Sequence, residues 1–170
     1  EIAQCLVGSE MCIRDRLDEM LSAANLAPSW KNSQTPRFYV ATGEKSKDAV
    51  REALPEFNRK NSENASAYIV TTVVLNRSGF DKDGTAVTEI GNGWGYYDLG
   101  LNNMALLLKA TELGISTLVM GIRDGEKLRK EFDIPETEAV VSVIAVGYTD
   151  SKIVRPKRKS VEDFAKFYEE

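Results

Sequence analysis

The sequence predicts an α+β fold, in which a mixed central β-sheet is flanked by helices. Residues 68–75 read YIVTTVVL, a nearly continuous β-branched run that is typical of a central strand covered on both faces. Residues 94–113 are apolar on several faces and end before Gly114, which indicates a helix packed in the middle of the fold. Strands and helices interleave without the strict βαβ repeat of a doubly wound domain, and this favours a mixed sheet.

The other elements are predicted from local patterns along the chain. Apolar residues at i, i+3, i+4 and i+7 from Leu17 predict a helix that ends near Leu26, ahead of Pro28. Residues 77–92 are rich in Gly, Asp and Thr, and we expect a long loop there, of a kind that tends to be functional or mobile. The patterns further predict strands at 37–41, 115–120 and 139–146, helices at 46–54 and 124–132, a polar stretch at 58–64, and a terminal helix opened by Ser160 and Asp163 in capping-box spacing.

Composition excludes several classes of function. The 170 residues fit one domain, and 42% apolar with 28% charged residues is ordinary for a soluble globular protein, so a cytoplasmic location is expected. The longest strongly apolar stretch, 104–108, is far shorter than the roughly 20 residues that span a bilayer, which argues against a membrane segment. A net charge of -4 argues against nucleic-acid binding. The chain has no histidine, which removes Ser-His-Asp and Cys-His catalysis and most zinc sites, so no catalytic side chain and no metal ligand are assigned.

The start of the chain is unusual. Residues 5–16, CLVGSEMCIRDR, resemble the translation of a sequencing-adapter fragment. We therefore expect residues 1–16 to be a non-native leader and residues 17–170 to form a single domain. The alternative is a genuine helical lead-in, with Leu6, Ile13 and Leu17 partly in phase. Both cysteines, Cys5 and Cys12, lie in this segment, so the expected native portion contains neither Cys nor His.

The run APSWKNSQ, residues 27–34, lies between a predicted helix end and a predicted strand. Ser29 and Asn32 offer a hydroxyl and an amide to a ligand, although a polar turn that satisfies its own backbone is an equal alternative. The run resembles the APSxxNxQ signature of the nitroreductase family, followed as in that family by Pro36 and an aromatic-bearing strand. The resemblance implies that Ser29 and Asn32 bind flavin heteroatoms or ribityl oxygens, and that Gln34 helps to hold the loop.

Three further segments resemble the same family in the same order. Residues 97–110 and 113–117 are similar to its long central helix and the exit from that helix. Met120, Gly121 and Ile122 stand where the family places a turn against the isoalloxazine near N5, although a simple strand-to-helix turn is an equal alternative. In the basic run 155–159, the resemblance implies that Lys157 and Arg158 hold the FMN phosphate, whereas a solvated tail is the alternative from charge alone.

Two other patterns do not match a known site. The glycine-rich residues 91–95 lack the GxGxxG spacing and a preceding strand, which argues against a Rossmann phosphate loop. Residues 81–84 resemble the start of a calcium loop, but Asn92 stands where that loop has its glutamate.

The resemblance implies an FMN-dependent oxidoreductase, acting as a homodimer with FMN at the interface. Electrons would pass from NAD(P)H through FMN to a nitroaromatic, quinone or similar small-molecule acceptor by a ping-pong mechanism. The family's N-terminal Arg-Arg-Ser-x-Arg motif is missing, and because 11–16 reads MCIRDR, Arg14 and Arg16 are not assigned as ligands. The alternatives are a specialised flavin dehydrogenase or dehalogenase of the same fold, or a non-catalytic flavin-binding protein or disabled fragment.

Overall fold

A four-stranded sheet forms the centre of the protein. The computed structural model describes residues 10–149, 154 and 156–169. The strands are β1 (Pro36–Ala41), β2 (Ala67–Val74), β3 (Ser116–Met120) and β4 (Glu138–Gly147), in the order β1-β2-β4-β3. The α+β class is confirmed, and the β-branched run at 68–75 does form an interior strand, buried along nearly its whole length.

The sheet differs in one respect from the mixed sheet that the sequence predicted. Each neighbouring pair of described strands runs antiparallel. The parallel relations hold only between strands that are not neighbours, β1 with β4 and β2 with β3. The prediction failed on this point because pairing is decided when the whole chain packs, and interleaved helices do not by themselves specify a parallel neighbour.

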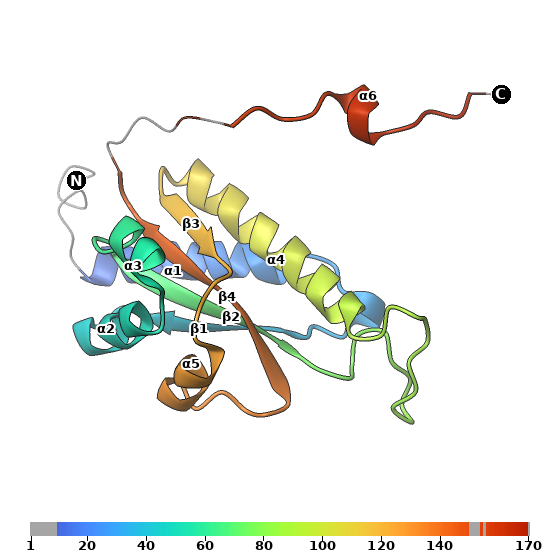
Figure 1. Ribbon diagram of the computed structural model, residues 1–170, viewed down its shortest axis with the longest axis horizontal. Helices are drawn as coiled ribbons and strands as arrows, with labels where there is room; N and C mark the ends of the chain where they lie inside the picture. The colour runs from blue at the N-terminus through green and yellow to red at the C-terminus, as the bar shows by residue number, and fades with distance from the viewer. Residues whose placement is uncertain (1–9, 150–153, 155, 170) are drawn as a thin grey trace.

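Helices cover both faces of this sheet (Figure 1). On one face lie α1 (Glu10–Asn25) and the long α4 (Gly93–Glu112), and on the other lie α2 (Glu44–Glu52) and α5 (Gly125–Glu131). α1 begins before Leu17, and Ile13 packs against the core beside it. The short α3 (Glu56–Asn61) falls where a polar stretch was expected; it buries no residue, so it carries no hydrophobic period that could reveal it.

The two faces bury two separate cores. Successive side chains of a strand point to opposite faces, so Ala67 and Ile69 join α1 and α4 in one core, whereas Tyr68 and Val70 join α2 and α5 in the other. Both faces of the central strands are therefore closed by apolar packing. This leaves the loops at the strand ends as the places where polar groups gather.

Helix α4 is apolar on two sides. Leu99, Leu106 and Ala110 are buried, and the last two pack against the sheet and α1. Tyr97, Met104 and Leu108, spaced seven and four residues apart and so on one stripe, are 60%, 51% and 59% exposed. The neighbouring edge strand β3 exposes Leu118 and Val119 as well. A helix that is apolar all round is normally covered on every side.

The C-terminal arm, residues 156–169, stands clear of the sheet in Figure 1. It contains α6 (Val161–Phe164), and the capping box expected from Ser160 and Asp163 is confirmed, with the Ser160 N–H donating to the Asp163 carboxylate at 3.1 Å. Its large apolar side chains, Phe164, Phe167 and Tyr168, are mostly exposed. Within the described part of the chain, no helix has the length and apolarity needed to cross a membrane.

Candidate functional site

The loop 27–34 connects α1 to β1 and has an unusual backbone. It contains the short helical turn η2 (Trp30–Asn32). Lys31, Asn32 and Gln34 adopt positive φ angles of 46°, 55° and 48°. The left-handed region is unfavourable for residues with a side chain, and it persists only where the surroundings impose it. Three such residues within four positions indicate a loop whose shape serves something other than local stability.

Hydrogen bonds hold Ser29 close to Gln34 and fasten the end of the loop to β1. The Ser29 hydroxyl accepts a hydrogen bond from the Gln34 N–H at 3.0 Å. Arg37, just inside β1, donates to the Gln34 carbonyl at 2.7 Å and to the Pro36 carbonyl at 2.8 Å. The Ser29 hydroxyl therefore bonds the backbone of its own loop, as in the polar-turn alternative, while the Asn32 side chain stays exposed.

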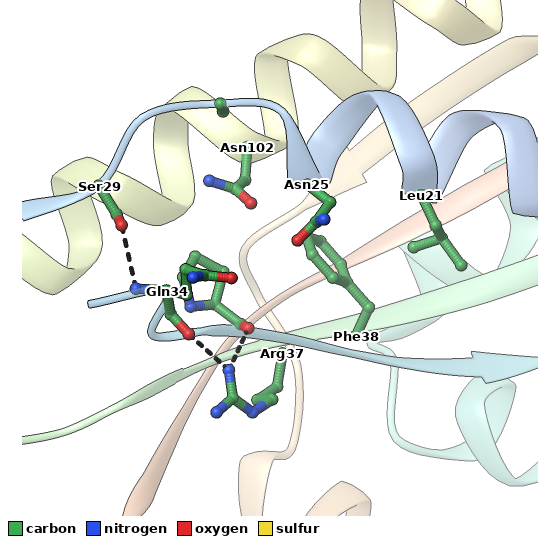
Figure 2. A pocket seen from close by; sticks show the side chains of 9 residues that line it. Leu21, Asn25, Ser29, Gln34, Arg37, Phe38 and Asn102 are labelled. Atoms are coloured by element: carbon green, nitrogen blue, oxygen red, sulfur yellow. Dashed lines mark hydrogen bonds between the residues drawn. The ribbon is translucent and has the colours of Figure 1, made fainter. Parts of the chain in front are cut away.

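A cavity of about 320 Å³ opens beside this loop (Figure 2). Its volume is at the lower end of the range for small-molecule sites. Hydroxyl, amide and guanidinium groups converge on it over an apolar floor, which suits a ligand with both a flat apolar body and polar edges. Its lining residues are Leu21, Asn25, Ala27, Ser29, Gln34, Pro36, Arg37, Phe38 and Asn102.

Sequence reasoning found Ser29 and Gln34 but missed Asn25, Arg37 and Asn102 as lining residues. Asn102 carried a usable signal, because it lies four residues after Asp98 on the apolar helix α4, and both are buried. Two polar residues one helical turn apart on a buried face mark a polar site inside a core. Asn25 and Arg37 carried none, since each is an exposed polar residue of an ordinary kind.

Aromatic rings flank the other side of the loop. The Trp30 and Trp94 rings are 4.7 Å apart, and Tyr97 meets Trp94 edge-on at 5.8 Å. Trp94 donates to the Thr88 hydroxyl at 2.8 Å, and Lys31 pairs with Asp81 at 3.4 Å. These contacts fasten the long loop 77–92 to the site, although both charges of the ion pair are largely exposed and add little stability.

The second predicted group lies at the end of β3. Met120 is buried, whereas Gly121 and Ile122 are exposed. A Cβ added at Gly121 would meet no atom within 4 Å, so the backbone here faces open space. A planar ring could approach this backbone closely because no side chain intervenes.

The predicted residues form three groups that one chain does not bring together. β1 and β3 are the two edges of the sheet, three strand spacings apart, or about 14 Å. The loop 27–34 precedes β1, and Gly121 follows β3. Lys157 and Arg158 lie exposed in the C-terminal arm, which stands clear of the sheet (Figure 1).

Arg14 and Arg16 belong to none of these groups. Arg14 pairs with Asp18 at 3.2 Å and Arg16 with Glu19 at 3.3 Å, both on the surface of α1. Such pairs between residues three or four apart are ordinary features of an exposed helix.

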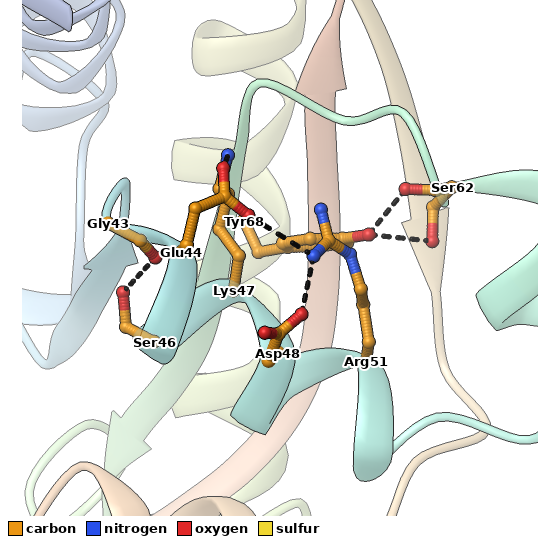
Figure 3. A network of polar contacts seen from close by, with 8 residues as sticks. All are labelled: Gly43, Glu44, Ser46, Lys47, Asp48, Arg51, Ser62 and Tyr68. Carbon is orange, nitrogen blue, oxygen red and sulfur yellow. Dashed lines mark hydrogen bonds and ion pairs between the residues drawn. The ribbon is translucent and has the colours of Figure 1, made fainter.

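A second polar network, on α2, is structural (Figure 3). Arg51 pairs with Asp48 at 2.7 Å and lies 5.8 Å from the centre of the buried Tyr68 ring. Lys47 pairs with Glu44 at 2.6 Å, and its hydrogen bond and charge lower the pKa of that carboxyl. The network fastens α2 over the core, and none of its residues lines the cavity beside the loop 27–34. Among the described residues there is likewise no cluster of acidic, His or Cys side chains that could hold a metal.

Fold and cavity together define an α+β protein with a candidate small-molecule site beside a strained polar loop. The model of the Nitroreductase family matches residues 13–148. The chain belongs to the nitroreductase family, and with it to the oxidoreductases.

Solved structures agree with this assignment. A nitroreductase family protein from Streptococcus pneumoniae TIGR4 superposes with a TM-score of 0.76 at 21% identity, covering 91% of this chain and 89% of the other. An oxidoreductase described as containing FMN gives 0.75 at 25% identity over 90% and 80%. CLA-ER, an enone reductase of gut-bacterial fatty acid saturation, gives 0.78 at 21% identity over 91% and 87%. No curated protein matched the chain.

Proposed function

We propose that this protein is an FMN-dependent oxidoreductase that takes electrons from NAD(P)H and passes them to a nitroaromatic, a quinone or a similar acceptor in two half-reactions. The observation that carries the proposal is the loop 27–34, where Lys31, Asn32 and Gln34 have positive φ and where Ser29 and Gln34 line a cavity. Family membership and the FMN-containing structure at 25% identity support the choice of cofactor.

The residues present fit a flavin. Ser29 and the amides of Asn25 and Asn102 could hydrogen-bond its polar ring edge or ribityl chain. Gly121 leaves room for the ring face, and the Met120–Ile122 backbone could lie against it. Lys157 and Arg158 suit a phosphate. Bound FMN would supply the hydride and electron chemistry, so no histidine or cysteine of the protein is needed.

The same groups require two chains. Because β1 and β3 are opposite edges of the sheet, Ser29 and Gly121 of one chain cannot both contact one flavin ring closely. A second copy could bring its own loop to the first chain's β3. The exposed apolar stripe of Tyr97, Met104 and Leu108, with Leu118 and Val119 beside it, is the surface that such a copy would cover. The proposed active form is therefore a homodimer with FMN at the interface.

The test begins with the purified full chain. We expect a yellow protein, or a colourless one that takes up added FMN with a shift of the flavin absorption bands. NADH and NADPH oxidation are then followed with a nitroaromatic, a quinone and an α,β-unsaturated ketone as acceptors. Failure to bind FMN at all would overturn the proposal; FMN binding without NAD(P)H oxidation would leave a flavin-binding protein and reject the enzyme.

A further inference from the structure

Asp98 is a buried carboxylate in the middle of α4, with only 2% of its surface exposed. Among the residues that the structure describes, it takes part in no ion pair. A carboxylate removed from water is costly unless hydrogen bonds replace the lost hydration. The groups that donate to Asp98 therefore identify what it does.

The donors connect Asp98 to the loop on both sides of its strained residues. The Trp30 N–H, 68 residues away in the sequence, donates to the two carboxylate oxygens at 3.2 and 3.1 Å. The Ser78 hydroxyl donates to Oδ2 at 2.5 Å. The Ser78 oxygen in turn lies 2.6 Å from the Ser33 hydroxyl and 3.2 Å from the Thr35 hydroxyl. One carboxylate thus fixes the loop directly at Trp30 and, through Ser78, at Ser33 and Thr35.

The strained residues lie between these two attachments. Lys31 and Asn32, both with positive φ, follow Trp30 and precede Ser33. Hydrogen bonds to a carboxylate are about twice as strong as those between neutral groups, so they can hold an unfavourable backbone in place. An apolar residue at position 98 would avoid the cost of burying the carboxylate, but it would leave the Trp30 N–H and the Ser78 hydroxyl without their acceptor.

We propose that Asp98 is the positioning residue of the cofactor loop. It holds Ser29 and Asn32 in the arrangement that receives the flavin, so that binding carries no cost of ordering the loop. This inference rests on the proposed function for its ligand, although the anchoring of the loop can be measured without any ligand.

The experiment compares three variants of the full chain with the wild type. Asp98→Ala removes both acceptor oxygens. Asp98→Asn keeps one oxygen for the Trp30 N–H, and its amide can donate to the Ser78 oxygen, so it serves as the conservative rescue. Thr71→Val is the control for stability, because it breaks an equally buried hydroxyl pair with Ser142, 2.8 Å apart, inside the sheet.

Two quantities are measured in each variant. The first is the hydrogen-exchange rate of the Trp30 amide by NMR without ligand, relative to the amides of β2. In Asp98→Ala we expect this ratio to rise at least about tenfold, as for a lost hydrogen bond to a charged acceptor, with Asp98→Asn in between and Thr71→Val unchanged. The second is the dissociation constant for FMN, which should follow the same order.

The outcomes separate the two proposals. An unchanged exchange ratio in Asp98→Ala overturns the anchoring role, whatever the flavin does. A raised ratio with wild-type FMN affinity overturns the positioning role, because the loop is then held without benefit to the cofactor. If the wild type binds no FMN, the proposed function fails by itself, and positioning for flavin fails with it. Equal loss of FMN in Thr71→Val and Asp98→Ala also contradicts positioning, since general destabilisation then explains both.

Discussion

Gly121 is the position where adding a single methyl group distinguishes a folding role from a binding role. Its added Cβ meets nothing within 4 Å, so Gly121→Ala should leave the stability of the free protein unchanged. If the flavin ring lies against this backbone, the methyl group should weaken FMN binding by about fivefold or more, as expected for a steric clash of about 1–3 kcal/mol. Fluorescence titration with FMN and thermal unfolding measure the two effects.

Gly43→Ala, at the start of α2, is the matched control, because its Cβ would only touch the Ser46 hydroxyl at 3.8 Å. We expect wild-type FMN affinity there. Wild-type affinity in Gly121→Ala as well would remove this turn from the cofactor site.

Tyr39 should give the stability of the protein a distinct dependence on alkaline pH. Burial, with a 2.9 Å hydrogen bond to the Glu138 carboxylate, raises the pKa of Tyr39 to about 12 from the ordinary 10. The folded state therefore binds the phenol proton more tightly than the unfolded state. The stabilisation is complete below about pH 10 and is lost as the pH rises toward about 12.

Urea unfolding at pH 9 and at pH 11 measures this loss, with Tyr39→Phe as the comparison. The phenylalanine variant has no proton to lose, so its stability should fall less between the two pH values than that of the wild type. An equal loss of unfolding free energy between pH 9 and pH 11 in the two proteins would show that Tyr39 titrates normally.

At the scale of elements, α2 illustrates how an exposed helix is fastened to a sheet. Replacing Arg51 by Met keeps much of the aliphatic stem but removes the pair with Asp48 and the cation over the Tyr68 ring. We expect a loss of about 1 kcal/mol in the free energy of unfolding. FMN affinity should not change, since α2 packs on the face of the sheet opposite to the cavity. Denaturant titration and FMN titration check the two statements.

Lys45→Met on the same helix is the control for that substitution. Lys45 is exposed, and its loss should change the free energy of unfolding by no more than about 0.5 kcal/mol. A similar loss in both variants would indicate that a change of helix charge, rather than the Arg51 contacts, is responsible.

Helices and strands could be predicted from the sequence wherever burial of one face gives a regular spacing of apolar residues. β2 and α4 carry strong apolar patterns, and the structure places both within a residue or two of the expected ends. α3 buries nothing and was missed. The APSWKNSQ motif drew attention to Ser29 and Gln34, which lie in one short loop and line the cavity. Asp98 was not found, because its contacts with Trp30 and Ser78 exist only once α4 has packed beside the loop.

At the scale of the whole molecule, the exposed stripe of α4 predicts how the protein assembles. Met104→Glu places a charge in the middle of that stripe, where a partner would bury it at high cost. We expect the wild type to sediment as a dimer and Met104→Glu as a folded monomer with at least about tenfold weaker FMN binding. Sedimentation velocity and circular dichroism test this directly.

Phe57→Glu is the control for assembly, because Phe57 is 75% exposed on α3 and does not belong to the exposed stripe of α4 and β3. It should remain a dimer. A monomeric wild type that binds FMN fully would contradict the two-chain site, and a dimeric Met104→Glu would move the interface to another surface.

The pair of Trp30 and Trp94 provides an intrinsic fluorescent probe of the candidate site. The chain has only two tryptophans, and their rings are 4.7 Å apart, between the loop 27–34 and the start of α4. All indole emission of the protein therefore originates at the loop 27–34 and the start of α4, and none comes from the sheet or from α2. A flavin arriving there would accept excitation energy from these rings, so that quenching near 340 nm would report occupancy of the site, without a label, in every variant that retains both tryptophans.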